Sequence, residues 1–262
     1  MRSAGHYGGS ASLRPATRMS VLTRLAAVCF VVALPVLFVT TNVRVIASAS
    51  GFYEAGLRRH DADRATGIAL TELDRAAQEI IEYFENDADT LRIVVSENGQ
   101  EATLFNARET EHMRDVKSLI RLVYRVNEVS LAFVLAYITG VFLWARERSL
   151  RELAWLALGG VGAGTVALGA IGVVALTGFD SAWSQFHELA FSNDLWQLDP
   201  DTDHLIQMFP ERFWAEATLT VGVMAIAEAT ATAALAVGYL LVARPRAGSG
   251  GQRERAQTGT GS

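Results

Sequence analysis

Residues 183–214 read WSQFHELAFSNDLWQLDPDTDHLIQMFPERFW, and the rest of the chain is organised around this stretch. It mixes aromatic, polar and titratable side chains densely, and long apolar runs lie on both sides of it. Aromatic residues concentrate where membrane helices meet water, so we expect the stretch to lie at a bilayer surface. His187, between Phe186 and Phe191, would then face a lipid-like environment. These residues indicate a site acting on a molecule held in the outer face of a membrane.

The apolar residues are unevenly spread along the 262 positions, half of which are hydrophobic. A helix needs about 20 apolar residues to cross a hydrocarbon core of roughly 30 Å. Four runs approach or exceed that length: 25–47, 129–145, 153–179 and 217–242. The sequence therefore predicts a mainly α membrane protein. It would have four transmembrane helices, an extracytoplasmic α+β segment and a second outer helical loop.

Arginines set the expected orientation, because cytoplasmic loops of membrane proteins are enriched in Lys and Arg. They cluster before the first run, between the second and third, and after the fourth (Arg14, Arg18, Arg24; Arg146, Arg148, Arg151; Arg244, Arg246, Arg253, Arg255). We therefore expect a multi-pass protein of the plasma membrane, with both termini in the cytoplasm and the site on the extracytoplasmic face. Ala47-Ser48-Ala49 also has the form of a signal-peptidase site, but an uncleaved anchor fits the other spans better.

The expected division of the chain follows from these runs and charges. Disordered cytoplasmic tails occupy 1–20 and 244–262, because they lack apolar surface. The spans are 21–47, 127–145, 153–179 and 215–243, with a cytoplasmic loop at 146–152. The extracytoplasmic parts are a domain at 48–126 and a loop at 180–214.

The outer segment 48–126 shows both helical and strand patterns. A helix is indicated by apolar residues at helical spacing, namely Leu73, Ala77, Ile80, Ile81 and Phe84. Residues 91–95 and 102–105 read as strands around an Asn-Gly turn, which predicts a small hairpin. From Glu109 a second helical pattern runs into the second span and carries His112.

Several functional classes find little support in the sequence. The formal net charge is −5 and there is no basic patch, so nucleic acid is not an expected partner. The one cysteine, Cys29, falls inside an apolar run. His187-Glu188 resembles the start of a zinc-protease motif, but Phe191 stands where the second histidine is needed. No phosphate-binding or dinucleotide motif is present, so we expect neither a metal nor a cofactor.

A calcium loop is also rejected. Asp199, Asp201 and Asp203 have its opening spacing, but His204 and Pro210 stand where glycine and glutamate are required. Asp199-Pro200 instead reads as the start of a helix, and so does Pro210-Glu211.

One carboxylate lies inside a predicted span. Glu228, in the fourth run, is either a functional group facing a cavity or a polar bridge between helices.

The chain has five histidines, and their placement is informative. His6 and His60 lie in polar segments and are expected to be solvated. His112 and His187 adjoin spans and can act together as a general acid–base couple. On the His112 helix, Glu109 is three residues before and Asp115 three residues after. Either carboxylate can orient the imidazole, or both can be ordinary surface charges.

Three motifs together resemble a known family. They are Phe105-Asn106-x-Arg108-Glu109-x-x-His112-Met113-x-Asp115, Phe186-His187-x-x-x-Phe191-x-Asn193-x-x-Trp196, and Leu205-Ile206-x-x-Phe209-Pro210-Glu211-x-Phe213-Trp214. The chain resembles, over roughly residues 20–243, the four-span integral membrane proteins that include the bacterial lipoprotein intramolecular transacylase. It departs from that family in its arginine-rich tails and acidic outer segment.

The resemblance implies a reaction and a pair of site residues. Family members move an acyl chain from the sn-2 ester of a diacylglyceryl-cysteine to the amino group of that cysteine, which gives a lyso-form lipoprotein. The family's two functional histidines fall on His112 and His187. Membrane lipids and lipid-modified lipoproteins are the implied partners. A non-enzymatic scaffold or envelope sensor, and a metal-dependent hydrolase using His187 and His204, are the alternatives.

For the transacylase we expect His187 as the base for the amine and His112 as the acid or oxyanion partner. The polar support would come from Glu109, Asp115, Arg108 and Asn193, and the acyl groove from Trp183, Phe186, Phe191 and Trp196. General acid–base groups act at hydrogen-bond reach, so the two imidazoles should lie within about 8 Å of each other.

Overall fold

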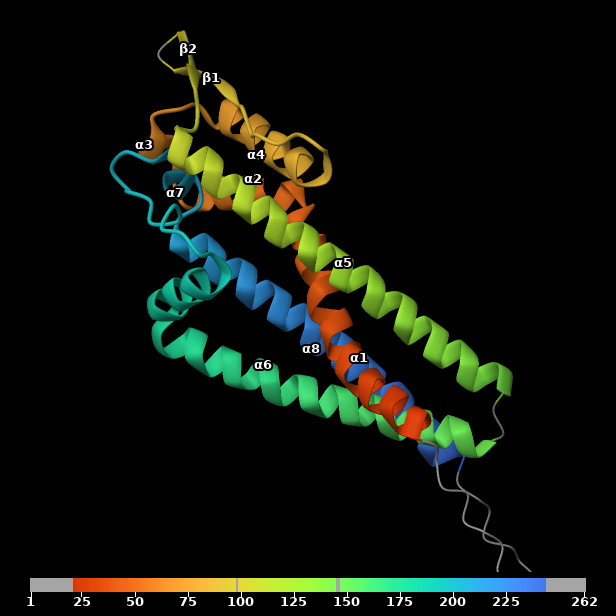
Figure 1. The fold of residues 1–262 in the computed structure, drawn as a ribbon. Helices are drawn as coiled ribbons and strands as arrows, with labels where there is room; N and C mark the ends of the chain where they lie inside the picture. Colours follow the sequence, from red (N-terminus) through yellow and green to blue (C-terminus); the bar gives the residue numbers. More distant parts are fainter. Residues whose placement is uncertain (1–20, 98, 145–146, 244–262) are drawn as a thin grey trace, which may run out of the picture.

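The apolar runs form the long helices of the computed structural model, which describes residues 21–97, 99–144 and 147–243 (Figure 1). Within this part of the chain, four helices contain a segment long and apolar enough to cross a membrane. They are α1 (Val21–Ala47), α5 (Ala107–Trp144), α6 (Glu147–Ala190) and α8 (Glu211–Val242). The protein is a multi-pass membrane protein of mainly α structure, and the predicted fold class is confirmed.

The helix α5 is far longer than a membrane requires. Its 38 residues extend about 57 Å at 1.5 Å per residue, against a hydrocarbon core of roughly 30 Å. The charged residues concentrate in its first half, at Arg108, Glu109, Glu111, Arg114, Asp115, Lys117, Arg121 and Arg125. This half therefore lies outside the hydrocarbon, and it joins the outer domain directly to a span.

The helix α6 is interrupted near its outer end. At Gly178 the backbone leaves the helical region, with φ 176° and ψ 74°, so two helices meet there. Figure 1 shows the chain folding back on itself at this end of α6. The residues after the break carry Trp183, Phe186 and His187. The break therefore turns an aromatic helix away from the direction of the span.

The bundle is centred on α1, which packs against α5, α6 and α8. Its buried core includes Phe30, Leu34 and Val134. Close approach of α6 depends on glycine: a Cβ built at Gly164 would lie 2.5 Å from Pro35 Cβ. Small residues on α6 thus allow it to pack closely against α1.

The outer domain is built from α2 (Ser50–Arg59), α3 (Ala62–Thr66), α4 (Leu70–Glu85), the hairpin β1 (Val94–Glu97) and β2 (Gln100–Thr103), and α7 (His204–Met208). The strands pair antiparallel, with Val94 opposite Thr103. The hairpin is therefore confirmed, but its first strand begins three residues later than the predicted 91–95. Leu91 and Ile93 lead into it as buried core residues.

One apolar core joins the two outer segments of the chain. Leu73, Ile80 and Phe84 of α4 are buried in it, as the helical spacing predicts. Met208 and Phe213, more than 120 positions later, lie in the same cluster. The segment between α6 and α8 is thus held against the outer domain.

One of the two helix starts expected in this segment is wrong, and the other is confirmed. Asp199-Pro200 does not begin a helix, because α7 starts at His204 with Asp203 in the N-cap position. Asp203 Oδ2 instead accepts a hydrogen bond from the backbone of Asp199, which closes a turn. The helix α8 does begin at Glu211, after Pro210.

Two polar residues outside the candidate site, Glu228 and His60, contact other helices. Glu228 on α8 accepts a hydrogen bond from Asn42 on α1 at 3.0 Å, so it bridges two helices. His60 is not solvated as expected: its Nε2 lies 3.5 Å from Glu216, and its side chain is 10% exposed. Several expectations fall outside the described residues: those for His6, for the tails 1–20 and 244–262, and for residue 146 of the loop 146–152.

Candidate active site

His112 lies on the second turn of α5, and its position is fixed by a cap at the start of that helix. Asn106 Oδ1 accepts from the Glu109 backbone N–H, and Glu109 Oε2 accepts from the Asn106 backbone N–H. This reciprocal pair is a capping box. Asn106 also donates to Asp203 at 2.8 Å, which ties the start of α5 to the turn before α7.

His187 lies in the helix that follows the break in α6. Its Nδ1 is 2.7 Å from the carbonyl oxygen of Trp183. A carbonyl can only accept, so Nδ1 carries the proton and, in the neutral ring, Nε2 keeps a free lone pair. Trp196 stacks on the imidazole at 4.9 Å between ring centroids, and Trp183 and Phe186 meet it edge-on.

The two histidines, 75 positions apart in the sequence, face each other. Their ring centroids are 6.0 Å apart, which lies within the expected 8 Å. Each side chain belongs to a residue that is only 6% exposed. Burial lowers the pKa of His112 to about 4, assisted by the charge of His187 and opposed by Asp115. Burial also lowers the pKa of His187, against the hydrogen bond to Trp183. Both shifts favour the neutral form of the imidazole.

Of the two carboxylates expected to orient His112, Glu109 binds backbone N–H groups instead. Glu109 is 1% exposed, and its second oxygen accepts from the backbone N–H of Leu205 at 2.7 Å. Glu109 thus joins α5 to α7. His112 Nδ1 is buried and has no hydrogen-bond partner among the described residues. Asp115 lies close enough to act on His112 electrostatically, but it hydrogen-bonds to Asn193 at 2.8 Å.

Arg108 and Asn193 hold the loop that follows α6. The Arg108 guanidinium donates to the carbonyl oxygens of Asp194 and Leu195. Asn193 donates to Asp115 and accepts from the Leu195 backbone N–H. These contacts place the loop beside the first turns of α5, and so bring Phe191 and Trp196 to the histidine pair.

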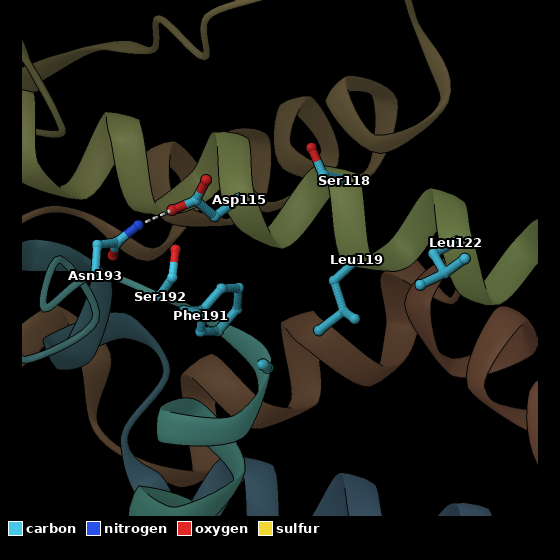
Figure 2. Close-up of a pocket in the computed structure, with 8 residues that line it drawn as sticks. Asp115, Ser118, Leu119, Leu122, Phe191, Ser192 and Asn193 are labelled. Carbon is cyan, nitrogen blue, oxygen red and sulfur yellow. Dashed lines mark hydrogen bonds between the residues drawn. The ribbon is translucent and has the colours of Figure 1, made fainter.

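A groove of about 280 Å³ lies beside Phe191 (Figure 2). It runs between α5 and the residues at the end of α6, and is lined by Asp115, Ser118, Leu119, Leu122, Ala190, Phe191, Ser192 and Asn193. The Phe191 ring contacts both His112 and His187, at 5.3 and 5.7 Å between centroids. Phe191 therefore connects the groove with the two imidazoles.

The groove differs from the aromatic one we expected. Of the four aromatic residues named for it, only Phe191 is among its lining residues, while Trp183, Phe186 and Trp196 surround His187. Leu119 and Leu122 were missed, although they follow Asp115 at helical spacing. Asn106 was also missed, although Asn106-x-x-Glu109 has the spacing of a capping box.

The metal-dependent alternative finds no ligand set in the described ranges. Among residues 21–97, 99–144 and 147–243, no three His, Cys, Asp or Glu side chains are grouped so that they could hold a metal. His204 Nδ1 is 2.7 Å from the carbonyl oxygen of Leu104 and lies against the outer domain.

Comparison with known proteins identifies the family. The profile described as "Lipoprotein intramolecular transacylase Lit" matches residues 28–214, which is most of the chain. The chain belongs to the Lit family.

Solved structures of a Lit protein share this fold. The lipoprotein intramolecular transacylase Lit from Bacillus cereus superposes with a TM-score of 0.70 at 16% identity, covering 84% of this chain and 97% of that one. Two forms of it with one histidine replaced, by arginine or alanine, match at 0.67. An uncharacterised protein of Aquifex aeolicus is 30% identical over 128 residues, 49% of this chain and 53% of that protein. The chain thus spans about half the length of this curated relative.

Proposed function

We propose that this protein transfers an acyl chain, at the outer face of the plasma membrane, from the sn-2 ester of a diacylglyceryl-cysteine to the amino group of the same cysteine. The observation that carries the proposal is the pair of buried imidazoles 6.0 Å apart in a chain of the Lit family. Membrane lipids and lipid-modified lipoproteins would be its partners. Both termini would lie in the cytoplasm.

His187 is the base in this proposal. Its Nδ1–H is held by the Trp183 carbonyl, so the free lone pair on Nε2 can take the proton of the substrate ammonium. Its lowered pKa favours the neutral form that a base needs. The aromatic rings around it exclude water, which strengthens electrostatic interactions in the site.

His112 is the acid or oxyanion partner. Buried polar atoms normally have a hydrogen-bond partner, and His112 Nδ1 has none among the described residues. A substrate carbonyl or the departing sn-2 oxygen would supply that partner. A neutral imidazole carries one N–H, which it can donate to the developing oxyanion.

The reaction is balanced with these two groups. The bond between the cysteine nitrogen and the acyl carbon forms, and the bond between that carbon and the sn-2 oxygen breaks. Of the two protons that the ammonium loses, one passes through His187 to solvent and one ends on the sn-2 oxygen. Nucleophile and ester belong to one molecule, so positioning supplies much of the rate enhancement.

Access to the imidazoles requires movement of a side chain, because each histidine is only 6% exposed. Phe191 contacts both rings and also lines the groove. A turn of its side chain would open the histidine pair towards the groove.

Mass spectrometry of a reporter lipoprotein tests the proposal. The full chain is expressed in a bacterial strain whose lipoproteins keep a free amino group on the diacylglyceryl-cysteine. We expect an N-acylated cysteine with one fewer O-linked chain and an unchanged total mass, resolved by fragmentation of the N-terminal peptide. An N-terminus that keeps both ester-linked chains and a free amine at full expression would contradict the proposal and favour the non-enzymatic alternative.

A further inference from the structure

The groove between α5 and the end of α6 is polar at one end and apolar at the other. Asp115 and Asn193 meet at one end, and Leu119 and Leu122 follow along α5 (Figure 2). The helix α5 begins at the outer domain, and its second half is the apolar, membrane-crossing part. The polar end therefore lies outward and the apolar end towards the lipid. An amphiphile standing in a bilayer has this same order of groups.

The charge at the polar end is negative. Asp115 is the one charged residue among those that line the groove in the described structure. Its Oδ2 accepts from Asn193, and none of the ion pairs among the described residues involves it. A carboxylate in this setting attracts a cationic head group and repels a phosphate.

The cations nearest in sequence are engaged elsewhere. The Arg108 guanidinium binds the carbonyl oxygens of Asp194 and Leu195. Arg114 pairs with Glu111 at 3.8 Å, Lys117 donates to Asn86 and Ala88, and Arg121 pairs with Asp87 at 3.0 Å. Among these side chains none neutralises Asp115, so a bound molecule would have to provide the positive charge.

The negative end of the groove lies beside the proposed chemistry. Asp115 follows His112 by three residues, and its charge acts on that imidazole. Phe191 lies against both histidines and also lines the groove. A cation held at Asp115 would be one side chain away from the base that has to deprotonate it.

We propose that this groove is the amine subsite, in which the Asp115 carboxylate binds the free α-ammonium of the lipid-modified cysteine while its lipid portion extends along Leu119 and Leu122. The inference rests on the proposed function and adds to it a basis for selectivity. An N-acylated lipoprotein has no ammonium and lacks the contact with Asp115. An anionic phospholipid is repelled there.

Binding of an unreactive substrate analogue separates this inference from catalysis. The probe is a fluorescent dialkylglyceryl-cysteinyl peptide with ether links in place of both esters, so no acyl transfer is possible. It is prepared with a free or an acetylated amino group, and added to the full chain in phosphatidylcholine nanodiscs. The readout is fluorescence anisotropy. We expect the wild type to bind the free amine about tenfold tighter, as for a hydrogen-bonded charge pair.

The key variant is Asp115→Asn, whose amide oxygen can still accept from Asn193. It should lose the preference for the free amine while binding the acetylated probe as the wild type does, which also reports that the groove is intact. Glu111→Gln is the matched control, because it removes a carboxylate from the same helix at a site 56% exposed and outside the groove. It should keep the preference.

Two results would overturn the inference: equal binding of both probes by the wild type, or a preference that persists in Asp115→Asn. Neither result bears on acyl transfer, which is read separately from the ester form of the same peptide. A preference that depends on Asp115, without any N-acyl product from the ester, would support the ammonium site and contradict the proposed function.

Discussion

At the scale of single residues, the site combines two imidazoles whose surroundings differ. His187 is held by a backbone carbonyl, and rings pack against it from several directions. His112 has a buried nitrogen without a partner in the described structure. Different surroundings suit different roles, because a base needs a free lone pair and an oxyanion partner needs an N–H that is not already used.

Replacing either histidine tests this division of roles. His112→Ala and His187→Ala should each lower the rate of N-acylation by a factor of about 10²–10⁴, the range for loss of a general acid or base. The rate is measured by mass spectrometry of the reporter N-terminus. Gln185→Ala is a control on the His187 helix, because Gln185 is exposed and its side chain donates to the nearby Ser181 on the same helix. A histidine variant with full activity, at wild-type expression, would remove that histidine from the mechanism.

The protonation of both imidazoles is also testable. Burial lowers the pKa of each below the ordinary value of 6.5, to about 4 for His112. Both should therefore be neutral at pH 7 and gain a proton only as the pH falls below 6.5. NMR titration of ¹⁵N-histidine protein in detergent measures this, with signals assigned by their loss in the two alanine variants. A midpoint at or above 6.5 for both rings would contradict the buried arrangement.

At the scale of elements, the site depends on how the outer domain is fastened to the bundle. Gly56 of α2 lies against Phe213 of α8, and a Cβ built there would be 2.5 Å from the ring. Phe213 packs edge-on to Trp214, which stacks on Trp183. A chain of contacts thus leads from α2 to the helix that carries His187.

A pair of glycine variants in α2 tests this fastening. Gly56→Ala should lower the stability, because overpacking costs about 1–3 kcal/mol and exceeds the helix propensity gained, roughly 1 kcal/mol. Gly51→Ala should be neutral or stabilising, since a Cβ there meets nothing within 4 Å. Thermal unfolding midpoints in detergent compare the two. Equal midpoints would show that the Phe213 ring can move away from the added methyl group without loss of stability.

At the scale of the whole molecule, the bundle separates two ends. The start of α1, the end of α5, the start of α6 and the end of α8 lie together at one end of the bundle, and the outer elements lie at the other (Figure 1). An even number of membrane crossings gives this arrangement. We propose that the outer elements face away from the cytoplasm, where lipoproteins are displayed.

Cysteine labelling in intact cells tests the orientation. The one natural cysteine, Cys29, is exposed on α1 within the apolar segment, and can be replaced by serine. In that background Glu101→Cys, in the exposed part of β2, should react with a membrane-impermeant maleimide. Ser149→Cys, near the start of α6, should react only after the cells are opened. The reverse pattern would invert the proposed topology.

The amino-acid sequence by itself determined the four apolar helices and the hairpin, and it singled out two histidines as candidates. Hydropathy and turn chemistry are local properties, so a run of apolar residues or an Asn-Gly pair can be read without knowing what packs against it. The helix start at Glu211 and the buried face of α4 followed in the same way. The family motifs selected His112 and His187 among five histidines.

Only the tertiary structure decided what each polar side chain contacts. Glu109 and Asp115 look equivalent on either side of His112, yet Glu109 accepts hydrogen bonds from the backbone N–H of Asn106 and from that of Leu205, 96 positions away. His60 lies against Glu216 for the same reason. Such pairings depend on which elements pack together, and packing joins residues distant in sequence. The groove, its single carboxylate and the 6.0 Å between the imidazoles exist only in the folded chain.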